Sequence, residues 1–176
     1  MKVMIERVAG GPRDGIDTHL STYFQRIWRQ VAPHHEAVII DPFARNCPLA
    51  THSNDKNPET KAQFHLDALD FLKMIDDESA DFVIFDPPFS PRQDKEKYEG
   101  ETVNVYTRPG YVPDLMKEII RFLRTGGQVL KFGYNTSCHH IQLDLERIWV
   151  VNEGGNRNDV LVSLWRKSQR TLREWC

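Results

Sequence analysis

Short apolar runs alternate with amphipathic helical segments along this chain, and this alternation constrains the fold more than any other feature of the sequence. The clearest apolar run is 81–85, Asp-Phe-Val-Ile-Phe, which has the length and composition of a buried strand. The clearest helical segment is 113–124, where apolar residues fall on one side at helical spacing. We expect this helix to end at Gly126-Gly127. Strands and helices in alternation predict an α/β fold, a doubly wound and mostly parallel sheet of the Rossmann-like kind.

The rest of the chain repeats this pattern. A helix is expected within 17–31, capped by Asp17 or Thr18, and another at 68–75. A third is expected to begin at Asn57, because Asn-Pro-Glu has the order of a helix start. The expected strands are 37–40, 49–53, 64–66, 128–134, 147–151 and 160–165, the last two forming a C-terminal antiparallel hairpin.

Length and composition bound the class of protein. The 176 residues fit one domain, the formal net charge is −2, and 40% of residues are hydrophobic. This balance excludes a polybasic tail protein and an acidic disordered chain, and no run approaches the ~18 apolar residues of a membrane span. The first residues lack the apolar core of a secretion signal, and the three cysteines lie far apart. We therefore expect a cytoplasmic protein with no metal site and no membrane contact.

Acidic residues follow four successive strands of the predicted sheet, namely Asp41, Asp55, Asp67 and Asp86. Ligands of such sheets bind beyond the carboxyl ends of the strands. Carboxylates beside a buried sheet are costly unless something pairs with them. Because the glycine-rich phosphate-binding motifs are absent, these acids favour a ligand with hydroxyl groups, an amino group or a positive charge.

Two strand ends carry a specific resemblance. Residues 86–89, Asp-Pro-Pro-Phe, resemble the D-P-P-[YFW] motif of S-adenosylmethionine-dependent amino-methyltransferases that act on nucleic-acid bases, and 41–43, Asp-Pro-Phe, resemble the start of that family's cofactor motif, D-P-F-x-G-x-G. The compact form is similar to DNA adenine-N6 methyltransferases of phages and mobile elements. The resemblance implies that S-adenosylmethionine is the cofactor, with Asp55 at its ribose and Asp67-Ala68 at its adenine ring. The implied cofactor-binding residues are Asp41, Pro42, Phe43, Ala44, Asp55, Asp67 and Ala68.

The same resemblance implies a catalytic role for Asp86, Pro87, Pro88 and Phe89. An exocyclic amino nitrogen is a poor nucleophile because its lone pair is delocalised into the ring. The Asp86 carboxylate and the Pro87 carbonyl can accept its N–H protons, which favours a tetrahedral nitrogen that attacks the methyl sulfonium. Proline fixes the backbone that presents this carbonyl. Phe89 would stack on a base that has left its helix.

The chain departs from the family in two ways. Neither glycine of the cofactor motif is present, so we expect Ala44 to allow the close approach and the loop after it to run differently. No separate target-recognition domain remains, because residues 1–176 are filled by one catalytic domain. Residues 90–110 form the spare segment, a candidate lid or substrate loop. Its candidate contacts with the substrate are Ser90, Arg92, Tyr98 and Tyr106.

The sequence favours methyl transfer to adenine N6 in DNA, because the acid at the head of the motif is common in adenine enzymes of the family. Cytosine N4, RNA and a protein glutamine amide stay open as targets. A second class is a non-catalytic binding or partner subunit, which the missing glycines motivate. The expected partner is nucleic acid, DNA more than RNA, and a homodimer would add surface for reading it.

Overall fold

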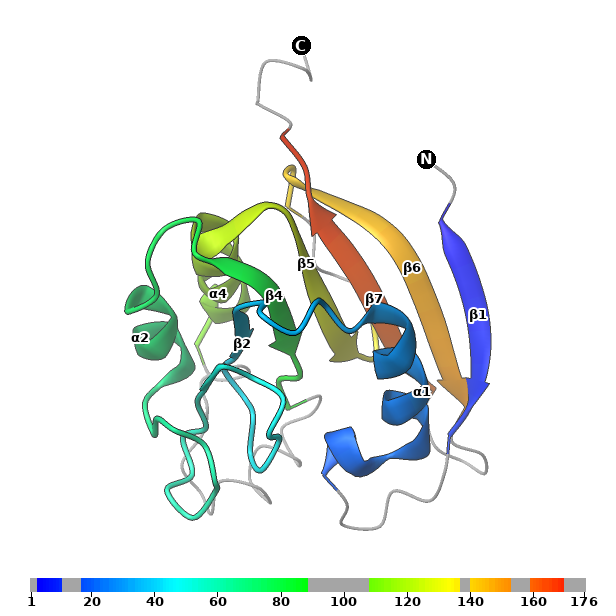
Figure 1. Cartoon of the computed structure of the whole chain (residues 1–176), viewed down its shortest axis with the longest axis horizontal. Coiled ribbons are helices and arrows are strands. Elements are labelled where there is room, and N and C mark those ends of the chain that lie inside the picture. The colour runs from blue at the N-terminus through cyan, green and yellow to red at the C-terminus, as the bar shows by residue number, and fades with distance from the viewer. Residues whose placement is uncertain (1–2, 11–16, 89–107, 137–139, 153–158, 170–176) are drawn as a thin grey trace.

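A computed structural model describes residues 3–10, 17–88, 108–136, 140–152 and 159–169 of the chain. Its strands form one seven-stranded sheet in the order β1-β6-β7-β5-β4-β2-β3 (Figure 1). The strand bounds are β1 Met4–Ala9, β2 Ile39–Asp41, β3 His52–Ser53, β4 Ala80–Phe85, β5 Leu123–Gly133, β6 Leu143–Asn152 and β7 Val160–Lys167.

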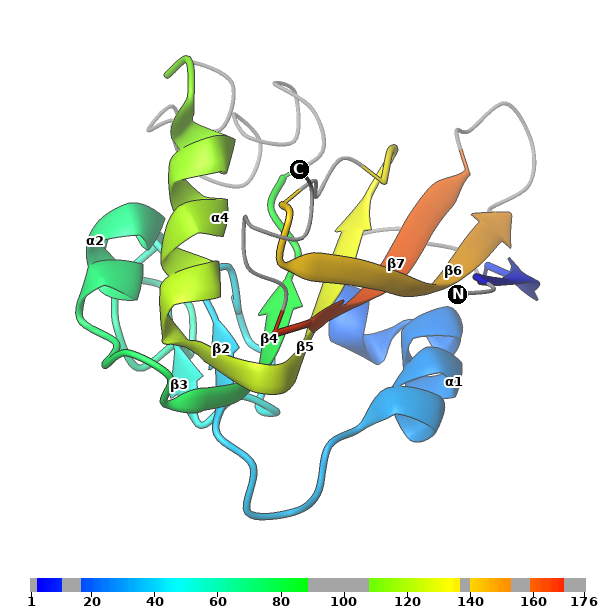
Figure 2. The same ribbon diagram turned by 90° about the horizontal axis from the view of Figure 1, so that it is seen from above.

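Helices cover both faces of this sheet (Figure 2). Helix α1, Thr22–Val31, follows a short 3₁₀ turn at Thr18–Leu20 and packs on one face. Helices α2, Ala68–Lys73, and α4, Tyr111–Phe122, pack on the other. Each interface has its own apolar core, so the sheet is buried from both sides along its central strands. This arrangement confirms the predicted doubly wound α/β fold.

The strand directions also agree with the prediction. Strands β2, β3, β4 and β5 are parallel to one another, whereas β7 runs antiparallel between β5 and β6. The expected C-terminal hairpin is therefore confirmed as β6 and β7. The weak strand expected at 64–66 is reduced to one parallel bridge between Phe64 and Asn54. The carboxyl ends of β2 and β4 consequently meet at one edge, where the ligand of such a sheet binds.

Strand β1 was not expected from the sequence. It pairs in parallel with β6 at the edge of the sheet, and Val8 is its one buried residue in the described structure. An edge strand with a single buried side chain carries almost no hydrophobic periodicity, so its sequence gives no signal.

The helix expected to begin at Asn57 is wrong. The Asn57 side chain accepts from the amide of Glu59 at 2.9 Å, as a helix cap would, but the segment stays a turn. The Thr60 hydroxyl donates to the Asn57 carbonyl at 2.9 Å, and Asp55 accepts from the Asn57 amide at 3.0 Å. Such local side-chain bonds compete with a helix, and no apolar stripe follows to stabilise one. At helix α1 the N-cap is Ser21, rather than the expected Asp17 or Thr18.

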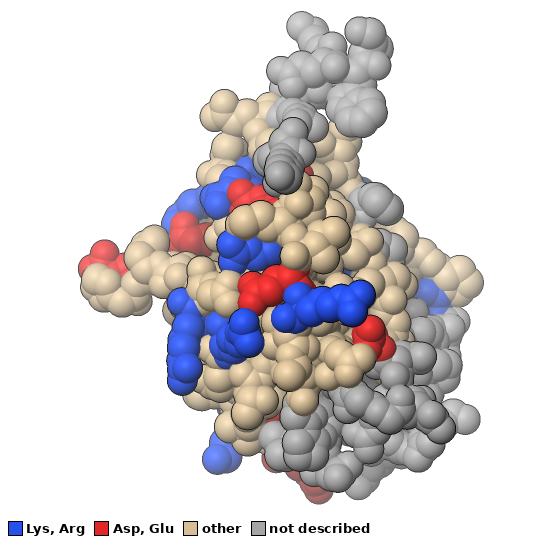
Figure 3. All heavy atoms as spheres, turned by 90° about the vertical axis from the view of Figure 1, so that its right-hand side faces the viewer, with Lys and Arg blue, Asp and Glu red and all other residues tan. Residues whose placement is uncertain are grey.

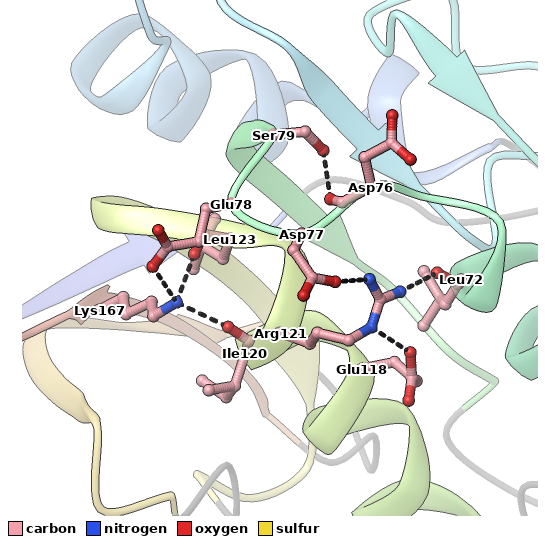
Figure 4. Close-up of polar contacts among 10 residues, drawn as sticks. All are labelled: Leu72, Asp76, Asp77, Glu78, Ser79, Glu118, Ile120, Arg121, Leu123 and Lys167. Atoms are coloured by element: carbon pink, nitrogen blue, oxygen red, sulfur yellow. Dashed lines mark hydrogen bonds and ion pairs between the residues drawn. The ribbon is translucent and has the colours of Figure 1, made fainter. Parts of the chain in front are cut away.

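Helix α4 ends at Phe122, before the predicted stop at the two glycines, and continues directly into β5. A cluster of charged side chains, which we call the α4 end cluster, satisfies the carbonyls there (Figure 4). Lys167 Nζ donates to the carbonyls of Ile120 and Leu123 at 2.8 and 2.6 Å, and lies 3.6 Å from Glu78 Oε1. A cation placed on the last carbonyls of a helix complements its dipole. The two other main members of the cluster are Arg121 and Asp77, which form an ion pair.

Among the described residues, every helix is too short or too polar to span a lipid bilayer.

Candidate active site

A hollow of about 300 Å³, counting the part open to solvent, lies between the carboxyl ends of β2 and β4 and the segment before α1. We call it the acidic hollow. Both Asp41, at the end of β2, and Asp86, just after β4, line it. Two strand ends that only their motifs connected in the sequence therefore lie at one hollow. Its described lining consists of Asp17, Thr18, His19, Phe24, Asp41, Phe43, Ala44, Arg45, Cys47, Ile84 and Asp86.

Asp41 is a buried carboxylate at the end of β2, with only 2% of its surface exposed. Burial raises its pKa well above the ordinary value, and the nearby charges of Asp86 and Asp55 raise it further. The hydrogen bond that Asp41 Oδ1 accepts from the Phe43 amide, at 3.0 Å, acts in the opposite direction. Like charges are thus held near one another at this edge, a placement that a positively charged ligand would stabilise.

The loop after β2 adopts a backbone conformation that normally belongs to glycine. Arg45 has a φ of 48°, in the left-handed region, and stands where the cofactor motif has its first glycine. The expectation that the loop after Ala44 runs differently from the family's loop stays a prediction. Ala44, which we expected to replace the glycine, is buried and donates to the Asn54 carbonyl at 2.8 Å.

Two carboxylates hold the Arg45 loop in this conformation. From inside, Asp55 Oδ2 accepts from the Arg45 amide at 3.0 Å. From outside, Asp17 Oδ1 lies 3.1 Å from Arg45 Nη1, and Asp17 Oδ2 accepts from Asn46 Nδ2 at 2.8 Å. Contacts of this kind offset the strain of about 1–3 kcal/mol that a left-handed non-glycine residue carries.

His19 and Cys47, two further titratable side chains of the acidic hollow, are uncharged near neutral pH. Burial lowers the pKa of His19, an effect that Asp17 opposes and Arg45 reinforces. Burial, together with the charge of Asp41, raises the pKa of the Cys47 thiol to about 12. Cys47 is therefore a thiol rather than a nucleophilic thiolate. The described residues contain no group of three or more His, Cys, Asp or Glu side chains placed to hold a metal ion.

Asp55, expected at the cofactor ribose, is fully buried and hydrogen-bonded to backbone amides. Its two oxygens accept from the amides of Arg45 and Asn57, each at 3.0 Å. In this structure it joins the loops after β2 and β3 and is not among the described residues that line the acidic hollow. The neighbouring Asn54 has a similar function, since its side-chain amide donates to the carbonyls of Pro42 and Leu66.

Asp67 and Ala68, expected at the adenine ring, form the start of α2. Asp67 Oδ1 caps the helix by accepting from the Leu69 amide at 3.0 Å, and it also accepts from the Tyr111 hydroxyl at 2.7 Å. Burial and the Asp67 carboxylate raise the pKa of Tyr111. Ala68 is buried in the core. Neither Asp67 nor Ala68 is among the described residues that line the acidic hollow.

The motif after β4 is described only in part. Asp86 is half-buried in the acidic hollow, and Pro87 and Pro88 are buried beside it. Phe43, from the first motif, packs edge-on against Phe85 at 5.8 Å between ring centroids. The remaining candidates lie outside the described residues: Phe89, Ser90, Arg92, Tyr98 and Tyr106.

Sequence reasoning missed the wall that the segment before α1 contributes. Asp17 and Thr18 were considered only as helix caps, and His19 was not considered at all. All three line the acidic hollow, and Asp17 contacts the loop after β2. Their spacing from Asp41 carries no motif, because tertiary packing alone brings them together.

The charged side chains that line the acidic hollow favour a ligand that carries a positive charge. Three carboxylates line the acidic hollow, whereas Arg45 is the one cation among its described lining residues, and it is already paired with Asp17. Aromatic and aliphatic surface from Phe24, Phe43 and Ile84 adds an apolar wall. Such a pocket can bind a cation with an apolar body and exclude part of its water.

Solved structures share this fold. The chain resembles the proposed methyltransferase yhhF from Escherichia coli, with a TM-score of 0.60 and 14% identity over 89% of this chain and 90% of that one. It resembles TrmN from Thermus thermophilus, with a TM-score of 0.59 and 14% identity over 84% of this chain and 49% of that one. It also resembles the proposed methylase HI0767 from Haemophilus influenzae, with a TM-score of 0.53 and 13% identity over 82% of this chain and 96% of that one.

No known family model matches the chain, and no curated protein matches it. The structural similarities show the fold: the chain has the Rossmann-like architecture found in methyltransferases.

Proposed function

We propose that the protein transfers a methyl group from S-adenosylmethionine to the exocyclic amino group of a nucleic-acid base, with adenine N6 in DNA as the target. The observation that carries this proposal is the convergence of Asp41 and Asp86 in one hollow. These residues head the two motifs that resemble the amino-methyltransferases, and 45 positions separate them in the sequence. A shared site is what the resemblance requires of them.

The chain's residues have separate tasks in this proposal. Asp41, Phe43 and Ala44 would hold the cofactor, which supplies an electrophilic methyl group on a cationic sulfur when bound. The Asp86 carboxylate and the Pro87 carbonyl would accept the amino N–H protons of the target base and orient its nitrogen. Because Pro87 and Pro88 fix the backbone, the acceptors are held in place before the base arrives.

The charge distribution supports a weak, local contact with nucleic acid. On the side of the molecule that carries β1, Lys and Arg side chains gather with a few acidic ones among them (Figure 3). Arg7 on β1 and Arg26 and Arg29 on α1 are exposed, and Arg26 forms an ion pair with Glu6 at 2.8 Å. Arginines on two adjacent elements can contact a phosphate backbone, although a chain of net charge −2 gives only a shallow salt dependence.

The test is transfer of a labelled methyl group to DNA and to RNA, followed by identification of the modified base. We expect N6-methyladenine in DNA from the wild-type protein and no labelled product from Asp86→Ala. Asp70→Asn, at an exposed acid of α2 outside the acidic hollow, is the matched control and should retain full activity. Equal label with wild type and Asp86→Ala would remove the assignment of the catalytic motif.

Mapping of methylated bases in DNA from cells that express the protein complements this assay, because it reports the base and its sequence context together. Label on cytosine N4, on RNA or on a glutamine amide would support methyl transfer to an amino or amide nitrogen but would identify a different substrate.

A further inference from the structure

Asp17 lies at the edge of the acidic hollow and contacts the side chains of Arg45 and Asn46, in the loop after β2. Its Oδ1 is 3.1 Å from Arg45 Nη1, and its Oδ2 accepts from Asn46 Nδ2 at 2.8 Å. The Asp17 side chain is 11% exposed and that of Arg45 is 34% exposed, so water screens this ion pair less than a fully exposed one.

The residue that Asp17 restrains creates a problem for a cation-binding site. Arg45 stands at a glycine position of the motif that the chain resembles, and it lines the same hollow as Asp41 and Asp86, with its guanidinium beside Asp17. A free guanidinium there would pair with those carboxylates and occupy the place of a cationic ligand. It would also repel the sulfonium of the proposed cofactor.

We propose that Asp17 is a positioning residue that makes the cofactor site usable despite Arg45. It holds the guanidinium against the segment before α1 and neutralises its charge, so that Arg45 does not compete with a cationic ligand for the carboxylates of the hollow. The bond to Asn46 fixes the next residue of the same loop. The inference rests on the proposed function, since it assigns Asp17 to the cofactor site of that function.

An effect of Asp17 on ligand affinity through charge can be separated from an effect through loop structure. If Asp17 acts through the charge of Arg45, its loss must affect a cationic ligand more than a neutral analogue of the same shape. S-adenosylmethionine and S-adenosylhomocysteine form such a pair, because the second lacks the methyl group and the positive charge on sulfur. Removal of Arg45 must also cancel the effect.

The experiment measures the affinity of both compounds by calorimetry for wild type, Asp17→Asn, Arg45→Gly and the double variant. We expect Asp17→Asn to bind S-adenosylmethionine about tenfold more weakly, as for a partly buried charge that loses its partner, and S-adenosylhomocysteine less than about threefold more weakly. The double variant should recover S-adenosylmethionine affinity to within about threefold of wild type. Asp70→Asn is the control for a lost acid outside the hollow.

Three results would overturn the inference: an unchanged affinity of Asp17→Asn for S-adenosylmethionine, an equal loss for both compounds, or a double variant that stays weak. If Asp17→Asn does not fold, Arg45→Met with Asp17 intact replaces it. That variant should bind S-adenosylmethionine at least as tightly as wild type, and weaker binding would overturn the inference. A wild-type protein that binds neither compound refutes the proposed function itself, a result distinct from a failure of Asp17 alone.

Discussion

The acidic hollow and the α4 end cluster use buried charge in opposite ways. In the α4 end cluster, Lys167 is buried against two carbonyls at the end of α4 and a carboxylate, so its charge is compensated within the chain. In the acidic hollow, Asp41 is buried near the like charges of Asp86 and Asp55, and its pKa rises as a result. The first arrangement stabilises the fold, whereas the second destabilises it, and a bound cation would offset this destabilisation. The difference is the one expected between a structural site and a ligand-binding site.

The largest effect is expected at Asp86, which tests the functional side of this comparison. In the proposed mechanism, Asp86→Ala removes a hydrogen-bond acceptor that stabilises the transition state, so we expect methyl transfer to fall by at least about 100-fold. The free energy of unfolding should stay close to that of wild type, because the half-buried side chain lies at the rim of the sheet. Labelled-methyl transfer and urea unfolding measure the two quantities. A large loss of stability would instead mark Asp86 as structural.

Lys167→Met tests the structural side. It leaves the carbonyls of Ile120 and Leu123 without their charged donor, and unfolding should become easier by about 3 kcal/mol. Cofactor affinity should not change, since Lys167 is not among the described residues of the acidic hollow. Urea unfolding and calorimetry measure the two quantities. If cofactor affinity falls while stability holds, the two sites are not independent.

Asp41→Asn should have opposite effects on stability and on binding. The raised pKa of Asp41 means that the folded state binds its proton more tightly than the unfolded state does. Stability therefore declines as pH rises above the ordinary value of about 3.8 and levels off once the folded-state pKa is passed. The amide variant should lack this decline and be more stable than wild type at neutral pH. Its affinity for S-adenosylmethionine should fall by about tenfold.

Thermal unfolding from pH 4 to 8, followed for wild type and Asp41→Asn, checks the stability part. Parallel pH profiles for the two proteins would contradict the role given to Asp41.

The smallest effect is expected at Tyr111, which tests whether Asp67 belongs to the structural side. Tyr111→Phe removes the 2.7 Å hydrogen bond to the helix cap and should cost about 1 kcal/mol of stability. Cofactor affinity should stay unchanged if Asp67 acts only as a cap, whereas a tenfold drop would favour its expected place at the adenine ring. Denaturant unfolding and calorimetry give both values.

The sequence predicted the central fold because the core strands and helices are strongly patterned. The runs that became β2 and β4 and the stripe that became α4 have the periodicities that burial requires. Strand β1 was missed because an edge strand with one buried residue needs no such pattern. The helix at Asn57 was wrong because local side-chain bonds closed a turn where a capping motif was present.

Prediction of the site was less complete. Asp41 and Asp86 could be found because they belong to motifs at strand ends. Asp17 and His19 could not, because their place in the acidic hollow depends on how the segment before α1 crosses the strand ends. The conformation of Arg45 was also out of reach, since the sequence shows an arginine and only the contacts to Asp17 and Asp55 explain its positive φ.

We infer that the acidic hollow binds a cationic methyl donor. Calorimetric titration of the wild-type protein with S-adenosylmethionine tests it most directly, with Asp41→Asn titrated in parallel. We expect saturable binding by the wild type and clearly weaker binding by the variant. No heat of binding at millimolar S-adenosylmethionine, or equal affinity of the two proteins, would contradict it.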